Sequence, residues 1–479
     1  TRVIVLFTFI AFNTPSYSQL WYITRGLSSD EVAWGLDTDS AGNIYWAVEQ
    51  KNNLPYWYYN IFLYKIAPDG QQIWQNNPYG GIYNDIAFVV KVKEPHVFLG
   101  GRSDSTWLPV SGDVLVLSYR TDDGSFQWDY RYNPAPDNGY EEIDGISIQP
   151  DGIYLTGWTK GLSTDEDFLI HKISNTGQFI WSNSWDYAGQ FDGANGHLAI
   201  DDHYIYAAGH TSLLQGTLVC FSRSNGSYQW DVTWDGSAND EVLGLTMSSD
   251  SMLYTTGYFG SSQNNSQVCI KKFSRNGHLH WTRYWGGSGT EDSRSLTTYR
   301  DSLIFVAGTT SSYGNGMTDI FVLKYDSAGT LLDSVLWGGA YDEVAKDIVL
   351  KDDDLYITGE TCSFGNGQIN GDHISDGLLL KINWRTMQAP DTTLSAKPTA
   401  ENQNDPVSVF PNPSRDFIFI KGIHKESQYR ITNLQGKTLL DGVISESASF
   451  IDISGIQKGV LLIEITSQER TVTKLIVKE

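Results

Sequence analysis

A short motif recurs along the chain about every 50 residues, and this repeat limits the possible folds more than any other feature. The motif is an aromatic residue, two further residues and a glycine. Intact copies span residues 154–157, 206–209, 254–257, 305–308 and 356–359, and degraded copies span 98–100 and 45–48. Self-similarity at this period indicates an array of like structural units, each burying its apolar faces against its neighbours.

Each period reads as four short strands. A second motif, glycine and then tryptophan four residues later, keeps the same step at residues 70–74, 124–128, 177–181, 226–230 and 277–281. In one repeat, polar turns separate β-type segments at residues 242–247, 252–256, 267–273 and 278–284. No segment sustains the 3.6-residue periodicity of a helix. Four strands in about 50 residues are typical of a propeller blade, so we predict an all-β, seven-bladed β-propeller over residues 19–386.

The two ends of this region complement each other. The last repeat has only three strands and ends at residues 378–384. Residues 21–31 begin with Trp and reach an acidic residue ten positions later, as do residues 281–291 and 230–240. We therefore expect residues 20–27 to form the missing outer strand of the last sheet. Such closure removes exposed sheet edges.

Two stretches carry a resemblance to a known repeat. Trp337–Glu343 has paired glycines followed by Asp and Glu, and Asp37–Tyr45 contains Gly42, Asn43 and the aromatic residue of the first motif. Over residues 20–386 the chain resembles the repeats of secreted bacterial β-propeller proteins. The resemblance implies a propeller and secretion, and it implies no single activity.

The N-terminus is typical of a processing segment. Residues 3–12 are an apolar run of ten, followed by Ser16-Tyr17-Ser18, a small-x-small pattern. This pattern predicts a signal peptide over residues 1–18, and a run of ten residues is too short to span a bilayer. The alternative is a buried N-terminal strand. No later stretch is apolar enough to span a membrane, so we expect no transmembrane segment in the mature chain.

The repeat motifs stop near residue 386. Residues 387–405 are polar and aperiodic, which is typical of a linker, and several short alternating strands follow in residues 406–479. These strands predict a small β-sandwich. The unit resembles the C-terminal sorting domain of the type IX secretion system, with matching stretches at residues 409–413, 431–437, 453–456, 459–463 and 474–478. Leu461 stands where that family usually has Tyr.

The second resemblance implies export by the type IX secretion machinery of a Gram-negative bacterium. It also implies a location outside the cell or on its outer surface. A generic carbohydrate-binding or immunoglobulin-like sandwich remains the alternative for this unit.

Composition excludes several classes of function. The formal net charge of −23 disfavours binding to nucleic acid or anionic lipid. Three cysteines in 479 residues cannot form a disulfide framework. The sequence contains no metalloprotease motif, nucleophile elbow or phosphate-binding glycine loop, so we expect no cofactor and no metal site.

Candidate binding residues follow from loop length. Loops between strands two and three, and between blades, share one face of a propeller, and here they are the long ones. We call this the long-loop face. Exposed aromatic residues there suit stacking on sugar rings or apolar side chains. The candidates are Trp57, Trp107, Trp158, Tyr258, Tyr313 and Phe364. Packing of these rings on their own blades is the alternative.

Acidic residues recur at the start of each blade: Asp30, Glu31, Asp85, Glu141, Glu142, Asp192, Asp240, Glu241, Glu291, Asp292, Asp342 and Glu343. A residue type repeated in every blade is best explained by bracing of the loops. The favoured function is a secreted or cell-surface protein whose long-loop face binds a glycan or a protein. The alternatives are a polysaccharide hydrolase or lyase with acidic residues near the channel, and a structural or adhesive surface component.

Overall fold

The computed structural model describes two compact units, Thr1–Ser395 and Ala396–Glu479. The described residues are 20–26, 30–51, 58–80, 83–104, 112–134, 139–160, 166–187, 192–211, 215–234, 240–260, 266–365, 374–390, 408–410, 417–421, 427–433, 437–444, 450–466 and 471–478. Within these ranges the regular structure is entirely β-strand. The predicted signal peptide, and most of the predicted linker, lie outside the described residues.

The first unit consists of seven antiparallel sheets, which we number as blades 1 to 7. Blades 1 to 3 are β2 (Leu36–Thr38), β3 (Ile44–Lys51), β4 (Tyr59–Ile66), β5 (Gln72–Gln75); β6 (Asp85–Lys93), β7 (His96–Asp104), β8 (Gly112–Arg120), β9 (Phe126–Tyr132); and β10 (Glu141–Gln149), β11 (Gly152–Thr159), β12 (Asp167–Ile173), β13 (Phe179–Trp185). Blade 4 is β14 (Gly193–Ala194), β15 (Ala199–Ile200), β16 (Tyr204–His210), β17 (Gly216–Ser222), β18 (Tyr228–Trp234).

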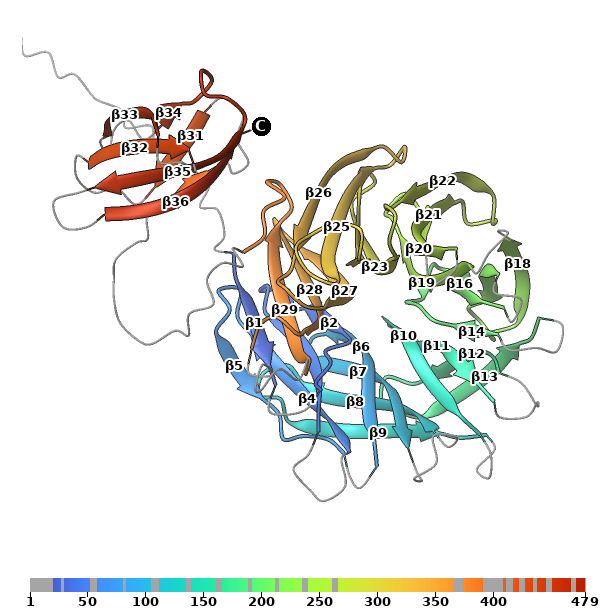
Figure 1. Cartoon of the computed structure of the whole chain (residues 1–479). Coiled ribbons are helices and arrows are strands. Elements are labelled where there is room, and N and C mark those ends of the chain that lie inside the picture. The colour runs from blue at the N-terminus through green and yellow to red at the C-terminus, as the bar shows by residue number, and fades with distance from the viewer. Residues whose placement is uncertain are drawn as a thin grey trace, which may run out of the picture. The chain divides into compact units, whose positions relative to one another are not determined.

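Blades 5 and 6 are β19 (Asp240–Met247), β20 (Leu253–Phe259), β21 (Gln267–Phe273), β22 (Leu279–Trp285); and β23 (Glu291–Tyr299), β24 (Leu303–Thr310), β25 (Asp319–Asp326), β26 (Leu331–Trp337). Blade 7 is β27 (Glu343–Lys351), β28 (Asp354–Thr361), β29 (Asp376–Asn383) and β1 (Tyr22–Arg25). Each blade contacts the next around a circle, and β2 of blade 1 contacts β27 of blade 7, so the ring closes (Figure 1). The all-β propeller prediction is confirmed.

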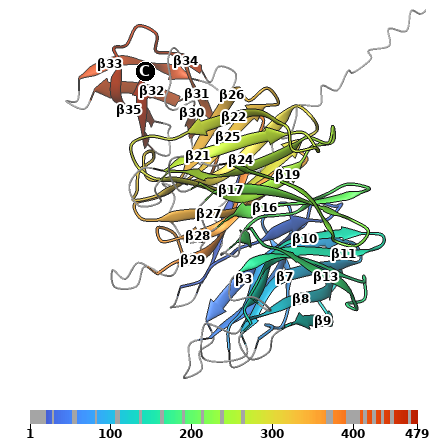
Figure 2. The ribbon, with the colours of Figure 1, turned by 90° about the vertical axis from the view of Figure 1, so that its right-hand side faces the viewer.

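The N-terminal strand closes the last sheet. β1 pairs antiparallel with β29, with Tyr22 opposite Leu380 and Arg25 opposite Gly377. Figure 2 shows the last sheet, in orange, beside the first strands, in blue. The prediction for residues 20–27 is therefore confirmed for residues 22–25, the strand that pairs.

The repeated glycine has a steric cause. In five blades the inner strand has a bulge two to four residues after the buried acid that begins it, as between Val242 and Gly244. Beside the bulge, a backbone carbonyl of the inner strand lies against the glycine of the second strand. A Cβ on Gly257 would lie 1.8 Å from the carbonyl oxygen of Glu241, and the repeated glycines of blades 2, 3, 4, 6 and 7 face the same clash.

This geometry revises the motif in blade 2. There the glycine against the bulge is Gly101, whose Cβ would lie 2.0 Å from the carbonyl oxygen of Ile86. Phe98–Gly101 is thus an intact copy of the motif and not a degraded one. Blade 1 has Val48 at this position, where the ladder of β2 and β3 ends at Leu36 and only an isolated bridge, between Val32 and Glu49, lies beyond it.

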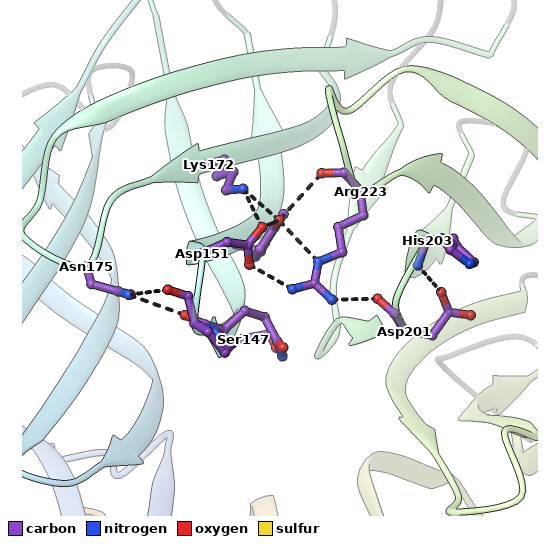
Figure 3. A network of polar contacts seen from close by, with 10 residues as sticks. Ser147, Asp151, Lys172, Asn175, Asp201, His203 and Arg223 are labelled. Atoms are coloured by element: carbon purple, nitrogen blue, oxygen red, sulfur yellow. Dashed lines mark hydrogen bonds and ion pairs between the residues drawn. The ribbon is translucent and has the colours of Figure 1, made fainter.

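Lysines on the third strands fasten neighbouring blades on the face opposite the long loops. The Nζ atoms of Lys65, Lys272, Lys324 and Lys381 each donate to a backbone carbonyl of the following blade, over 2.8–3.2 Å. Lys381 does so across the closing seam, to Pro68. Between blades 3 and 4, Asp151 accepts from Lys172 at 2.9 Å and from Arg223 at 2.7 Å (Figure 3).

The second unit has two sheets around one apolar core. One sheet joins β30 (Ser408–Phe410), β31 (Phe417–Lys421) and β34 (Phe450–Asp452), and the other joins β33 (Thr438–Ile444), β32 (Ser427–Asn433), β35 (Gly459–Thr466) and β36 (Thr471–Lys478). Ile418 and Ile420 from the first sheet share a buried cluster with Ile431 and Ile463 from the second. Two packed sheets of alternating strands form a sandwich.

Candidate functional site

A cavity of about 260 Å³ lies among the inner strands of the propeller. All seven blades line it, through Trp34, Phe88, Glu142, Asp144, Asn195, Gly196, His197, Glu241, Leu243, Arg294, Lys346 and Asp347. We call it the axial cavity. Concave sites with a few convergent polar groups are where small molecules usually bind, although typical sites are somewhat larger, about 300–1,000 Å³.

The bulges aim the lining residues. In the five bulged inner strands the unpaired residue is Phe88, Asp144, Leu243, Arg294 or Lys346, and each of them lines the cavity. A bulge leaves one residue without a ladder partner and redirects its side chain, and bulges are common beside functional sites. The same local irregularity thus requires the repeated glycine and supplies the cavity wall.

Blade 3 contributes two carboxylates. Glu142 accepts from Arg102 at 3.1 Å and from the indole nitrogen of Trp158 at 2.6 Å. Burial raises the pKa of Glu142, and the nearby Arg102 guanidinium opposes that shift. Burial also raises the pKa of Asp144 well above its usual value, and the Glu142 carboxylate adds to the shift. The buried Oδ2 of Asp144 has no hydrogen-bond partner among the described residues.

Blade 5 contributes a carboxylate held by neutral donors. Glu241 accepts from the Tyr258 hydroxyl and from the Asn195 amide, the latter at 2.6 Å. The same amide nitrogen lies 2.7 Å from Nδ1 of His210. Because an amide nitrogen can only donate, Nδ1 is the acceptor in this contact. The blade 3 and blade 5 carboxylates Glu142, Asp144 and Glu241 form what we call the acidic wall.

The cations of blades 6 and 7 are paired. Arg294 lies 3.2 Å from Asp292, and Lys346 lies 3.0 Å from Glu360. The Lys346 ammonium also lies 4.3 Å from the centre of the Trp34 ring, a cation–π contact. Burial lowers the pKa of Lys346, and the Glu360 carboxylate opposes the shift.

An interrupted strand closes the cavity on one side. In blade 4 the inner strand breaks into β14 and β15, and Asn195–Leu198 lie between them. His197, from this break, places Nε2 3.6 Å from Oδ1 of Asp347 in blade 7. Asp347 also accepts from Ser295 in blade 6 at 2.6 Å. Burial lowers the pKa of His197, while Asp347 opposes that shift.

The predicted aromatic residues divide into three groups. Trp158 and Tyr258 lie at the ends of second strands rather than in loops, and they contact Glu142 and Glu241 of the acidic wall. Tyr313 is 42% exposed and donates to the Gly286 carbonyl, apart from the cavity. Phe364 is buried against Tyr22 and Trp337 and presents no free ring. Trp57 and Trp107 lie outside the described residues.

The repeated acids also divide. The first acid of each inner strand is buried: Glu31, Asp85, Glu141, Asp192, Asp240, Glu291 and Glu343. These residues brace loops, as where Gly287 N–H donates to Glu291 at 2.9 Å and Gly339 N–H donates to Glu343 at 2.6 Å. The next residue differs between blades, and it is Glu142 or Glu241 where the acidic wall forms.

The sequence reasoning missed Asp144, Asn195, His197, Arg294 and Lys346. A signal was present for four of them, because Asp144, Asn195, Arg294 and Lys346 each lie three residues after a repeated acid, where the repeats differ. His197 lies five residues after Asp192. Among the described residues no group of three or more His, Cys, Asp or Glu side chains could hold a metal ion. No helix in the described ranges is long and apolar enough to cross a membrane.

A second hollow, of about 660 Å³, lies between blades 3 and 4 near Asp151, His203 and Arg223 (Figure 3). Its charged groups bond to one another: Arg223 donates to Asp151 and to the carbonyl of Asp201 at 2.9 Å. These contacts hold the two blades together, so the axial cavity is the stronger candidate for a binding site.

The fold and the C-terminal unit define a secreted β-propeller protein. Residues 408–479 match the secretion system C-terminal sorting domain. The chain thus has the C-terminal domain of proteins that the type IX secretion system delivers to the cell surface or the extracellular space. No curated protein matches the chain.

Several solved structures are similar in fold. They include a putative 6-phosphogluconolactonase from Bacteroides fragilis (15% identity, TM-score 0.44, covering 70% of this chain and 98% of that one). A quinohemoprotein alcohol dehydrogenase from Pseudomonas putida has 10% identity and TM-score 0.44, covering 82% and 78%. The WD40 β-propeller domain of Doa1 has 11% identity and TM-score 0.35, covering 60% and 93%. None of these likenesses says what this chain binds.

Proposed function

We propose that the propeller is a carbohydrate-binding module, and that a terminal sugar enters the axial cavity from the long-loop face. The observation that carries the proposal is a cavity lined by all seven blades, in which carboxylates and an amide converge beside aromatic rings. Sugars present many hydroxyl groups, and buried carboxylates and amides can bond to them in both directions. A volume of about 260 Å³ suits the end of a chain rather than its length.

Trp158 and Tyr258 support the long-loop face as the way in. Both lie at the ends of second strands, where the long loops begin, and each donates to a carboxylate of the acidic wall. Trp158 also stacks on Tyr140, with ring centres 4.4 Å apart. Rigid, partly exposed aromatic residues of this kind anchor ligands at low cost in conformational entropy.

A glycan array followed by calorimetry on the mature chain tests the proposal. The informative variants are Trp158→Ala and Glu241→Gln, because each removes one hydrogen bond of the acidic wall. We expect each to weaken sugar binding about tenfold or more. Ile180→Ala is the control, since Ile180 is exposed on the outer strand β13. Full affinity in both variants would place binding elsewhere.

The hydrolase or lyase alternative rests on the same wall. Glu142 and Asp144 both have pKa values raised by burial, which is how enzymes keep a carboxylic acid protonated near neutral pH. Product release from a polysaccharide panel, abolished by Asp144→Asn, would favour that alternative over simple binding. A defect only in cell attachment, with no binding and no turnover, would favour a structural role.

A further inference from the structure

We propose that the ligand group entering the axial cavity is a primary ammonium, carried by an amino sugar whose amine is not acetylated. This inference rests on the proposed function and adds the chemical class of the sugar. The ammonium would lie against the acidic wall of Glu142, Asp144 and Glu241.

The acidic wall has more negative than positive charge. Among the described residues, the one guanidinium that contacts its carboxylates is that of Arg102, which lies 3.1 Å from Glu142. Arg102 also lies 2.9 Å from Asp104, so its charge is shared. Glu241 accepts from the neutral Tyr258 and Asn195 side chains, and Nδ1 of His210 lies 3.7 Å from its Oε1. Asp144 Oδ2 is buried without a hydrogen-bond partner in the described part of the chain.

A buried carboxylate oxygen without a partner is costly, and a bound cation that donates hydrogen bonds removes the cost. The cations on the other side of the cavity do not serve this purpose, because Arg294 is paired with Asp292 and Lys346 with Glu360. The burial-raised pKa of Asp144 agrees with a site that lacks its counter-charge.

The aromatic residues decide which kind of cation fits. Quaternary ammonium groups bind to open aromatic faces. Here the Trp34 ring is covered by Lys346, and the Trp158 ring is stacked on Tyr140 at 4.4 Å. A primary ammonium has three N–H donors and needs acceptors instead. The carboxylate oxygens of the acidic wall provide them.

The charge of the whole chain points the same way. A net charge of −23 attracts cations and repels polyanions at long range. Sugars bearing carboxylate or sulfate groups are therefore disfavoured before they reach the cavity. Neutral sugars are neither attracted nor repelled, and amino sugars are attracted.

Calorimetry on the mature chain at pH 7 tests the inference with three probes of equal length: glucosamine, N-acetylglucosamine and glucose oligosaccharides. We expect the glucosamine oligomer to bind at least tenfold more tightly than the other two. Asp144→Asn should reduce that preference to less than threefold. Asp122→Asn is the control, because Asp122 is exposed and paired only at the surface.

Repeating the titrations in buffers of different ionisation enthalpy adds a second readout. Binding of an ammonium should release protons from the wild-type chain, and less so from the Asp144→Asn variant. Retained tryptophan fluorescence of the variant shows that it is folded. Equal binding of the acetylated and free amines overturns the inference and leaves the proposed function standing. Binding of none of the three sugars overturns both.

Discussion

Adding one methyl group at Gly257 should distort both the blade and the cavity. The Cβ of Gly257→Ala would lie 1.8 Å from the Glu241 carbonyl oxygen and 2.9 Å from its carbon, and these backbone atoms cannot rotate away. Relief requires the inner strand to move by more than about 1 Å, which is about a fifth of the roughly 4.8 Å between strands. Loss of two ladder hydrogen bonds at about 1 kcal/mol each, together with overpacking of about 1–3 kcal/mol, predicts a destabilisation of about 3–5 kcal/mol.

Denaturant unfolding followed by tryptophan fluorescence measures this effect in the propeller alone, because residues 396–479 contain no tryptophan. Gly193→Ala is the matched control. Gly193 lies on an inner strand, and the nearest atom to its added Cβ is 3.5 Å away, an ordinary contact. We expect the control to change stability by less than about 1 kcal/mol. A Gly257→Ala variant as stable as the control would refute the steric explanation of the repeated glycine.

Three further outcomes follow from contacts described above. Lys381→Met removes a buried ammonium that bonds the Pro68 carbonyl at 2.9 Å across the closing seam and pairs with Asp354 of its own blade at 3.0 Å. The variant should lose about 3–5 kcal/mol of stability in denaturant unfolding, unlike exposed Lys93→Met, and equal stability of the two would contradict a role for Lys381 at the seam. Burial raises the pKa of Glu141 from 4.5 to about 7. The contribution of Glu141 to stability is therefore complete below about pH 4.5 and is lost as the pH rises through 7. The melting temperature of Glu141→Gln should lack that decline with pH, and an unchanged pH dependence would contradict the raised pKa. An inert cargo fused to residues 406–479 should reach the cell exterior, and cargo retained in the periplasm would contradict the sorting role.

The repeat made the propeller predictable. A fixed period of four strands specifies a propeller, and the repeats within this chain can be compared with one another as homologous sequences are compared in an alignment. The match of Trp21 to Trp281 and Trp230 placed β1 on β29 because identical blades need identical outer strands. The bulge could not be predicted, since it depends on how a carbonyl of one strand meets a glycine of the next.

The candidate site was only partly predictable. Repetition draws attention to positions that every blade shares, such as Glu291 and Glu343, and these brace the loops. A cavity on the axis is built from positions where the blades differ, so the residue types of Asp144 and His197 are not repeated at the equivalent positions of the other blades. Phe364 follows a second strand and was therefore expected to be exposed in a loop, but its ring is buried between Tyr22 and Trp337.

The pairing of β1 with β29 sets an order on biosynthesis. Tyr22 is made before all of blades 1 to 6, yet its partner Leu380 leaves the ribosome only after those six blades are complete. Until β29 has been made, the N-terminal strand has no sheet edge to pair with. Because the two ends of the ring are adjacent, a circularly permuted chain that joins them and opens between two other blades should assemble the same circle from a different starting point.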